Sequence, residues 1–304
     1  MKHLYLTVAM LTIAIAFSTS RAALPPTSQP VPSVLEPLKA TVGKHYAFKG
    51  MVLSFRAEQP ITEEQWKAIE GLGIRLIQTG GKGIDDAAIA RLAKLDPEGL
   101  GLDGSAITDD GCKYLAEMKS LRWLGVGHTT LGKNGFNGSG FAQLKSLPKL
   151  ERLGFGGTAA GDEAMNAIGE LSQLKEFSSW HTHFTVASNA AFRKLTHLTK
   201  LTLGNSMPAW DGKPRRLSLT DATLDDLSQM PALEDLTLMQ AKLTLPALEK
   251  LKSVPHLKSL KLDGVDIEPA DVDKLRTELP TVKIEYKALT DEGKAKLADF
   301  LTHK

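Results

Sequence analysis

Three histidines come closest to a metal site in residue type and spacing. His181 and His183 are separated by one residue, and His128 lies earlier in the chain. Zinc binds an imidazole nitrogen at about 2.0–2.1 Å, so all three side chains would have to converge on one point. No cysteine or acidic residue has a spacing that completes such a site. We therefore interpret them as exposed histidines in turns, and keep a metal-binding or hydrolytic protein as the alternative.

A near match to a phosphate-binding loop runs from Gly127 to Asn134. A loop that binds nucleotide phosphates needs Ser or Thr after its lysine, and a helix that begins there. Asn134 follows Lys133, and the glycines after it disfavour a helix. We therefore do not predict a nucleotide site.

The remaining reactive side chains have structural explanations. Cys112 is the only cysteine and occupies a position that Leu or Met fills elsewhere, so we expect a buried thiol. Paired acids at Asp85–Asp86, Asp109–Asp110 and Asp225–Asp226 fall where helices should begin, and negative charge is stabilising there. Neither a G-x-S-x-G nor an H-E-x-x-H motif is present. We predict no catalytic residues, no metal site and no cofactor.

The elements that position these residues belong to an internal repeat. The unit has the form L-x-x-L-x-L followed by a segment of helical period, and three of the six spacings between clear units are 24 residues. Alternation at Leu236 and Leu238 predicts a short strand with one buried face. Leu245, Leu248 and Leu251 then recur with the spacing of a helix. One unit cannot bury both apolar stripes, but stacked units can.

At this point the chain resembles the leucine-rich repeat family. The matching segments include Leu121 to Val126, Leu233 to Leu238 and Leu257 to Leu262, and Ile107-Thr108-Asp109 is similar to the helix-backed, ribonuclease-inhibitor-like subclasses. The resemblance covers about residues 61–301. It implies an α/β solenoid, curved, with parallel strands on the concave face and helices on the convex face. The family is mainly an interaction scaffold, so the resemblance implies no particular ligand.

The chain is expected to comprise five segments. A short basic start and the apolar run from Leu4 to Phe17 indicate a signal peptide over residues 1–22, because about 20 apolar residues are needed to span a bilayer; the alternative is an uncleaved anchor. Residues 23–38 are rich in proline and predict an extended linker. A capping region at 39–72, repeats at 73–288 and a capping helix at 289–304 follow. The protein is therefore expected to be exported, to a periplasm or the extracellular space, with no membrane span after cleavage.

Composition excludes several other classes of protein. The chain has 304 residues, 42% hydrophobic and 24% charged, which is typical of a globular protein. The formal charge is +2, and the two basic residues of the leader, Lys2 and Arg21, account for it. A neutral mature chain has no general attraction to nucleic acid, so no nucleic-acid partner is expected.

The outward positions of the expected strands are the best candidates for binding. Early units carry glycine there, at Gly101, Gly125 and Gly154 among others, and Trp180 lies beside them. Glycine in a strand can mark the close approach of a ligand. We predict bare backbone bordered by an exposed Trp180. The alternative is that Trp180 turns inward to replace Ser179, since a shift of one residue reverses every side chain.

Insertions in two units fall between strand and helix, and therefore on the same rim of the solenoid. One lies within Leu131 to Gly140 and the other near Met207 to Leu217. Insertions on one side of a repeat protein often build its binding surface; the alternative is a pair of tolerated loops. The predicted binding residues on the concave face and this rim are Trp180, His128, His181, Asn205, Trp210, Arg215 and Arg216.

The sequence therefore predicts a non-catalytic, exported binding scaffold. A protein or peptide is the expected ligand, with carbohydrate next because aromatic rings stack on sugars. Beside the metal-binding or hydrolytic alternative, a purely structural envelope component remains open.

Overall fold

Short strands recur along the chain and pair in the order in which they occur. The computed structural model describes residues 30–44, 50–129, 136–207 and 216–302. Among the strands in these residues, only β1 and β2 pair antiparallel, and every later pair is parallel. The strands are β1 (Thr41–Lys44), β2 (Met51–Arg56), β3 (Leu76–Gly80), β4 (Gly99–Asp103), β5 (Trp123–Gly127), β6 (Arg152–Gly156), β7 (Glu176–Trp180), β8 (Lys200–Gly204), β9 (Asp235–Met239), β10 (Ser259–Asp263) and β11 (Lys283–Tyr286).

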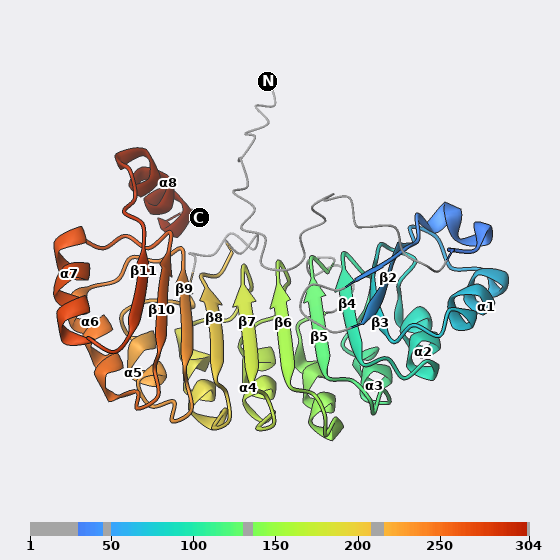
Figure 1. The fold of residues 1–304 in the computed structure, drawn as a ribbon, viewed down its shortest axis with the longest axis horizontal. Helices are drawn as coiled ribbons and strands as arrows, with labels where there is room; N and C mark the ends of the chain where they lie inside the picture. The colour runs from blue at the N-terminus through green and yellow to red at the C-terminus, as the bar shows by residue number, and fades with distance from the viewer. Residues whose placement is uncertain (1–29, 45–49, 130–135, 208–215, 303–304) are drawn as a thin grey trace.

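A helical segment follows almost every strand and returns the chain to the start of the next. Figure 1 shows these segments behind the sheet, with the chain running from the blue end at the right to the red end at the left. The expected α/β architecture, a solenoid-like stack of parallel strands alternating with helices, is confirmed. The segments are η1 (Ser33–Leu38), α1 (Glu63–Gly71), α2 (Asp86–Lys94), α3 (Cys112–Leu115), η2 (Ser139–Ser146), α4 (Asp162–Gly169), η3 (Val186–Lys194), α5 (Thr223–Leu227), α6 (Leu245–Glu249), η4 (Lys250–Ser253), α7 (Pro269–Glu278) and α8 (Asp291–Thr302).

The strand leucines align from one unit to the next. Leu124 is opposite Leu153, and Leu201 is opposite Leu236. These residues and Phe177, which lies between them in the sheet, are all buried. The alternation of apolar residues therefore sets the register, because a slip of one residue would bring this whole row to the surface.

Phenylalanines occupy the core of the middle units. Phe141 contacts Phe136 and Phe155 with ring centroids 5.7 Å apart in each case, and Phe155 contacts Phe177 at 5.6 Å. All are buried. Here two units use 3₁₀-helices, η2 and η3, in place of α-helices. The buried rings therefore fill the core beside these two 3₁₀-helices.

Carboxylates at helix starts join one unit to the next. Asp86 accepts hydrogen bonds from the backbone N–H of Thr108, at 2.9 Å, and from its hydroxyl, at 2.6 Å. Asp162 makes the same pair of bonds with Thr185. Asp85 instead caps its own helix by accepting from the N–H of Ala88. The prediction that acids here are structural is confirmed for Asp85 and Asp86, although Asp86 acts between units.

The two ends of the stack differ from expectation. The linker was expected to extend to residue 38, but Ser33–Leu38 forms η1, which buries Leu35 and Leu38 in the core. Val34 also packs against the core, and the burial of these apolar residues outweighs the extended tendency of the proline-rich segment. At the other end, α8 buries only Leu297 and so covers little of the last unit.

The helices of the structure are short, and α8, with 12 residues, is the longest of those described. Within the residues that it describes, none is long and apolar enough to span a bilayer.

Candidate functional site

The open face of the sheet, opposite the helical segments, is where Trp180 lies. Ser179 is fully buried and Phe177 is 2% exposed, so these two side chains point into the core. Trp180 is half-buried on the other face. The alternative in which Trp180 turns inward is therefore excluded, because alternate residues of a strand point to opposite faces.

The indole of Trp180 lies on glycine backbone of the neighbouring strand. A Cβ placed on Gly156 would be only 2.5 Å from the ring, far inside normal contact. On the opposite side of Trp180, a Cβ on Gly204 would be 2.7 Å from the Trp180 Cβ. Because glycine has no Cβ, these two positions leave room for the Trp180 side chain.

Trp123 repeats the arrangement two strands away, on β5, and the sequence pattern did not single it out. Its ring lies over β4, where a Cβ on Gly99 or Gly101 would come within 3.0 Å of it. Trp123 is also half-buried on the open face. The available signal was the pairing of Trp123 with Gly99 and of Gly125 with Gly101, which follows from stacking one repeat on the next.

The prediction of bare glycine backbone is wrong. Gly101, Gly125, Gly154 and Gly156 are all buried. Indole rings cover Gly101 and Gly156, and the Ser178 hydroxyl lies beside Gly154. Gly101, Gly154 and Gly156 therefore leave room for side chains of adjacent strands.

His128 lies at the carboxyl edge, where the strands end. Its backbone is left-handed, with φ of 46°, at the position that Gly104 and Gly157 occupy in adjacent units. Its Nδ1 is 2.7 Å from Oδ1 of Asp103. This hydrogen bond raises the pKa of His128, against the opposing effect of desolvation. The side chain is 62% exposed, so it is accessible to a ligand.

His181 occupies the equivalent position two units later but has different neighbours. Its φ is 51°. Its Nε2 is 2.8 Å from Oε1 of Gln240, and its ring centroid is 5.7 Å from that of Phe300 in α8. The last helix therefore partly covers this histidine.

The structure gives no support to a metal site on the three histidines. Among the residues that it describes, no three His, Cys, Asp or Glu side chains lie close enough together to hold an ion. His128 and His181 are bound to different partners, Asp103 and Gln240. Cys112 is buried as expected, and burial raises the pKa of its thiol.

Asn205 was predicted to contact a ligand, and its burial corrects that prediction. It is 0% exposed. Its Oδ1 accepts from the N–H groups of Ser206 and Ser218, and its Nδ2 donates to the Leu219 carbonyl. A buried amide with satisfied hydrogen bonds is structural; here it anchors the start and end of the insertion.

The predicted rim is only partly described. Arg216 is exposed, and its carbonyl accepts a hydrogen bond from Ser206 Oγ at 2.7 Å. Trp210 and Arg215 lie outside the described residues. Arg216 is therefore held beside Asn205 through the backbone, with its side chain at the surface.

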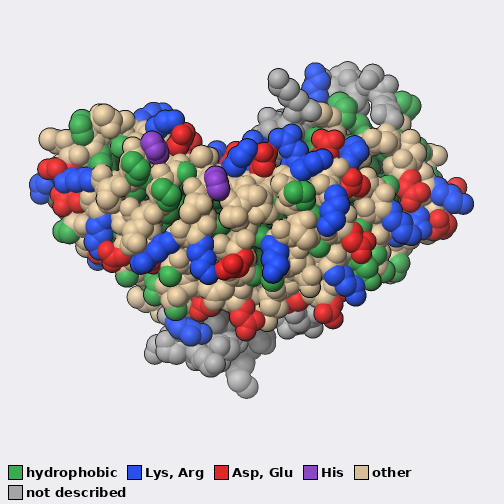
Figure 2. Space-filling view, turned by 90° about the horizontal axis from the view of Figure 1, so that it is seen from below, with side chains coloured by type: hydrophobic (Ala, Val, Ile, Leu, Met, Phe, Trp, Pro, Cys, Tyr) green, Lys and Arg blue, Asp and Glu red, His purple; other side chains and the backbone are tan. Residues whose placement is uncertain are grey.

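Charges on the open face occur in pairs. Arg152 binds Glu176 at 3.1 Å, and Lys261 binds Asp263 at 2.9 Å. Figure 2 shows acidic and basic side chains interspersed over the surface seen along the strands, with a notch on the side of the open face. Among the described residues, these two basic side chains on the open face are therefore each paired with an acid.

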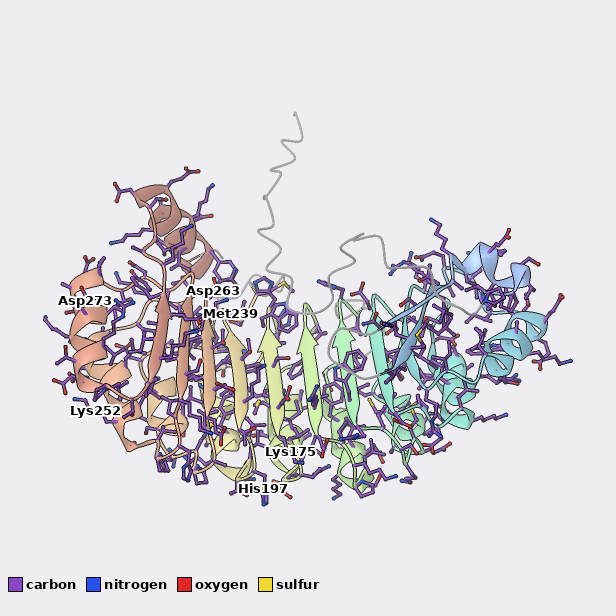
Figure 3. The ribbon with its side chains drawn as sticks, viewed as in Figure 1. Lys175, His197, Met239, Lys252, Asp263 and Asp273 are labelled. Carbon is purple, nitrogen blue, oxygen red and sulfur yellow. The ribbon has the colours of Figure 1, made fainter. Side chains whose placement is uncertain are left out.

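The two edges of the sheet present different groups. Figure 3 places Met239 and Asp263 near the carboxyl ends of β9 and β10, and Lys175 and His197 at the opposite edge. Lys175 binds Glu151 at 2.7 Å, and His197 lies 3.0 Å from the Ser172 carbonyl. Lys175 and His197 thus take part in contacts between neighbouring turns at the amino-end edge.

No protein family and no curated protein with which the sequence was compared matches this chain.

Proposed function

We propose that this protein is an exported, non-catalytic binding scaffold of the leucine-rich repeat type. Its ligand, a protein or peptide or a carbohydrate, would contact the open face of the sheet and the adjacent carboxyl edge. The observation that carries the proposal is Trp180, a half-buried indole on the outward face of a regular stack. Large aromatic side chains at such positions are the usual energetic centres of binding surfaces.

Three polar side chains at the carboxyl edge support binding at the same surface as Trp180. His128 and Arg216 are exposed at the carboxyl edge, and His181 is partly exposed there. Side chains on successive strands of a solenoid hold fixed spacings, so a ligand can contact several units at once. Asn205 contributes to this surface only by fixing the backbone beside Arg216.

A crosslinking experiment tests this proposal. A photo-reactive amino acid at Thr237, on the open face, should capture the same partner repeatedly from the native envelope or culture fluid. The same group at Gln143, exposed on η2 at the helical side, is the matched control and should capture nothing specific. Trp180→Ala in the Thr237 probe should abolish capture while the protein stays folded. Equal capture from both positions, or capture that survives Trp180→Ala, would remove the open face from consideration.

A further inference from the structure

The last helix, α8, lies on a different side of the molecule from the helices of the repeats. Figure 1 shows α8 above the carboxyl ends of the strands, while α4 and α5 lie behind the sheet. Lys294, near the start of α8, binds Glu268 at 3.1 Å in the turn after β10. The Phe300 ring lies 5.7 Å from the ring of His181, at the end of β7. The helix therefore runs back from β10 toward β7, over the edge to which the proposed function assigns a ligand.

One face of α8 contacts the rest of the protein. The residues of α8 that are not exposed are Gly293, Lys294, Leu297, Phe300 and Leu301. Their spacing of three or four residues places them on one side of the helix. Leu297, Phe300 and Leu301 have the i, i+3, i+4 pattern with which an amphipathic helix binds a partner protein. The carboxyl edge thus already holds a helix in the way in which proteins bind helical peptides.

The docking of α8 removes little apolar surface from water. Within α8 only Leu297 is buried, at 8% exposure, whereas α4 buries five residues. Residues 287–290 join α8 to β11, and three of these four are exposed. Segments with little apolar burial open at a small cost in free energy. We therefore expect α8 to leave the edge far more readily than a helix of the repeats leaves the stack.

Local contacts keep α8 helical, and two acids favour one direction of the helix. The Thr290 hydroxyl accepts a hydrogen bond from the N–H of Gly293 at 3.1 Å, which caps the first turn. Lys294 binds Glu268 and lies 3.8 Å from Asp266. These acids favour a helix that brings a basic residue to the end of β10 and its apolar residues toward β7.

We infer that α8 is an internal substitute for an amphipathic helix of a partner protein. The partner's helix binds where α8 lies, at the carboxyl ends of β7 to β10, after α8 has left. This inference rests on the proposed function, names its partner as a helical protein segment and adds autoinhibition. The preferred segment has the order K-x-x-L-x-x-F-L of α8 itself. The short connection keeps α8 at an effective concentration on the order of millimolar, so a dilute or weakly binding segment cannot displace it.

Binding of a synthetic α8 peptide tests the site directly. A peptide of residues 288–302, labelled with a fluorophore, is titrated with the chain that ends at Lys287 and with the full-length protein. We expect the shortened chain to bind the peptide. The full-length protein should bind it at least about tenfold more weakly, because its own helix occupies the site. Binding of the peptide to neither chain, or to both chains equally, would overturn the inference.

Matched variants separate this site from nonspecific binding. The peptide with Leu297→Ala and Phe300→Ala should bind about tenfold more weakly, because it lacks two apolar anchors. Lys294→Gln should weaken binding about threefold, whereas Lys296→Gln makes the same change of charge at an exposed position and should not. Full-length protein with Leu297→Ala and Phe300→Ala should bind the natural peptide as the shortened chain does, without any loss of residues. Equal affinity of all the peptides would refute the site.

Crosslinking separates this inference from the proposed function. The photo-reactive group at Thr237 should capture more partner in full-length protein with Leu297→Ala and Phe300→Ala than in the natural protein. Free α8 peptide should suppress this capture. If the two proteins capture a partner equally, the scaffold stands and the inference is refuted. Capture by neither protein refutes the proposed function, and the inference with it.

Discussion

The two ends of the repeat stack are closed in different ways. At the amino-terminal end, η1 buries Leu35 completely and Leu38 to 6% exposure, and β1 adds an antiparallel strand. Helix α1 beside them has a capping box between Thr62 and Gln65. At the carboxyl-terminal end, the side chains of β11 are half-buried or exposed, and α8 buries only Leu297.

A terminal unit can therefore be protected by apolar burial or by charged side chains. The first end uses apolar burial, which stabilises in proportion to the area removed from water. The last strand instead carries Lys283 and Glu285, and charged side chains on an edge strand disfavour pairing with another chain. Helix α8 lies over the carboxyl edge. There Lys294 binds Glu268 at 3.1 Å, and Phe300 contacts His181.

Removing each end in turn should give the largest difference in stability between the two ends of the stack. A chain that begins at Gly50 loses the buried side chains of Leu35, Leu38 and Val42, each worth about 1.5–3 kcal/mol. We expect its first units to unfold well before the rest in urea. A chain that ends at Lys287 should unfold within about 1 kcal/mol of the full-length protein, since few contacts are lost. Equal destabilisation by the two truncations would contradict the comparison.

Substitution of one buried leucine at each end should show the same difference in stability, with smaller losses. Leu35→Ala should cost about 2–5 kcal/mol, as large-to-small changes in a core do. Leu297→Ala should cost about 1 kcal/mol or less, because its effect cannot exceed the free energy with which α8 docks. Urea denaturation of both variants measures the difference. A larger loss from Leu297→Ala would mean that α8 closes the stack after all.

Phe300→Ala tests whether α8 is held through His181. We expect a loss of about 0.5–1 kcal/mol, the range of an aromatic contact, with faster amide exchange in α8 and a changed NMR signal from His181. The signal of His128 should not move, which makes that histidine the internal control. Protection of α8 that is unaffected by the substitution would assign its docking to other residues.

The smallest effect should come from Lys294→Gln. Exposed ion pairs contribute about 0–1 kcal/mol and are screened by salt. Amide exchange in α8 should therefore accelerate with added NaCl in the natural protein and respond less in the variant, while η1 stays protected in both. An equal response of η1 to salt would show that charge also contributes at the first end.

Much of the fold could be predicted because its signals are local and repeated. The leucine pattern placed the strands, and it correctly aligned Leu124 with Leu153 and Leu201 with Leu236. It placed Trp180 next to glycine but left its direction open, and the structure shows that it points outward. Its misses depend on contacts between units: the helix η1 inside a proline-rich segment, the seat of Trp123 on β4, and the burial of Asn205. Periodicity tells which face a residue belongs to, but not which neighbour occupies the space above it.

By itself, the sequence determined that short strands and helical segments would alternate and stack, because each unit has two apolar stripes that only a neighbouring unit can bury. The tertiary structure decided what occupies the open face and the ends. Glycines that the sequence predicted to be bare backbone lie beneath two indoles. Two histidines at equivalent positions, His128 and His181, bind different partners, Asp103 and Gln240. The physical reason is that burial and hydrogen bonding depend on atoms brought together from separate units, whose relative placement follows only from the packed stack.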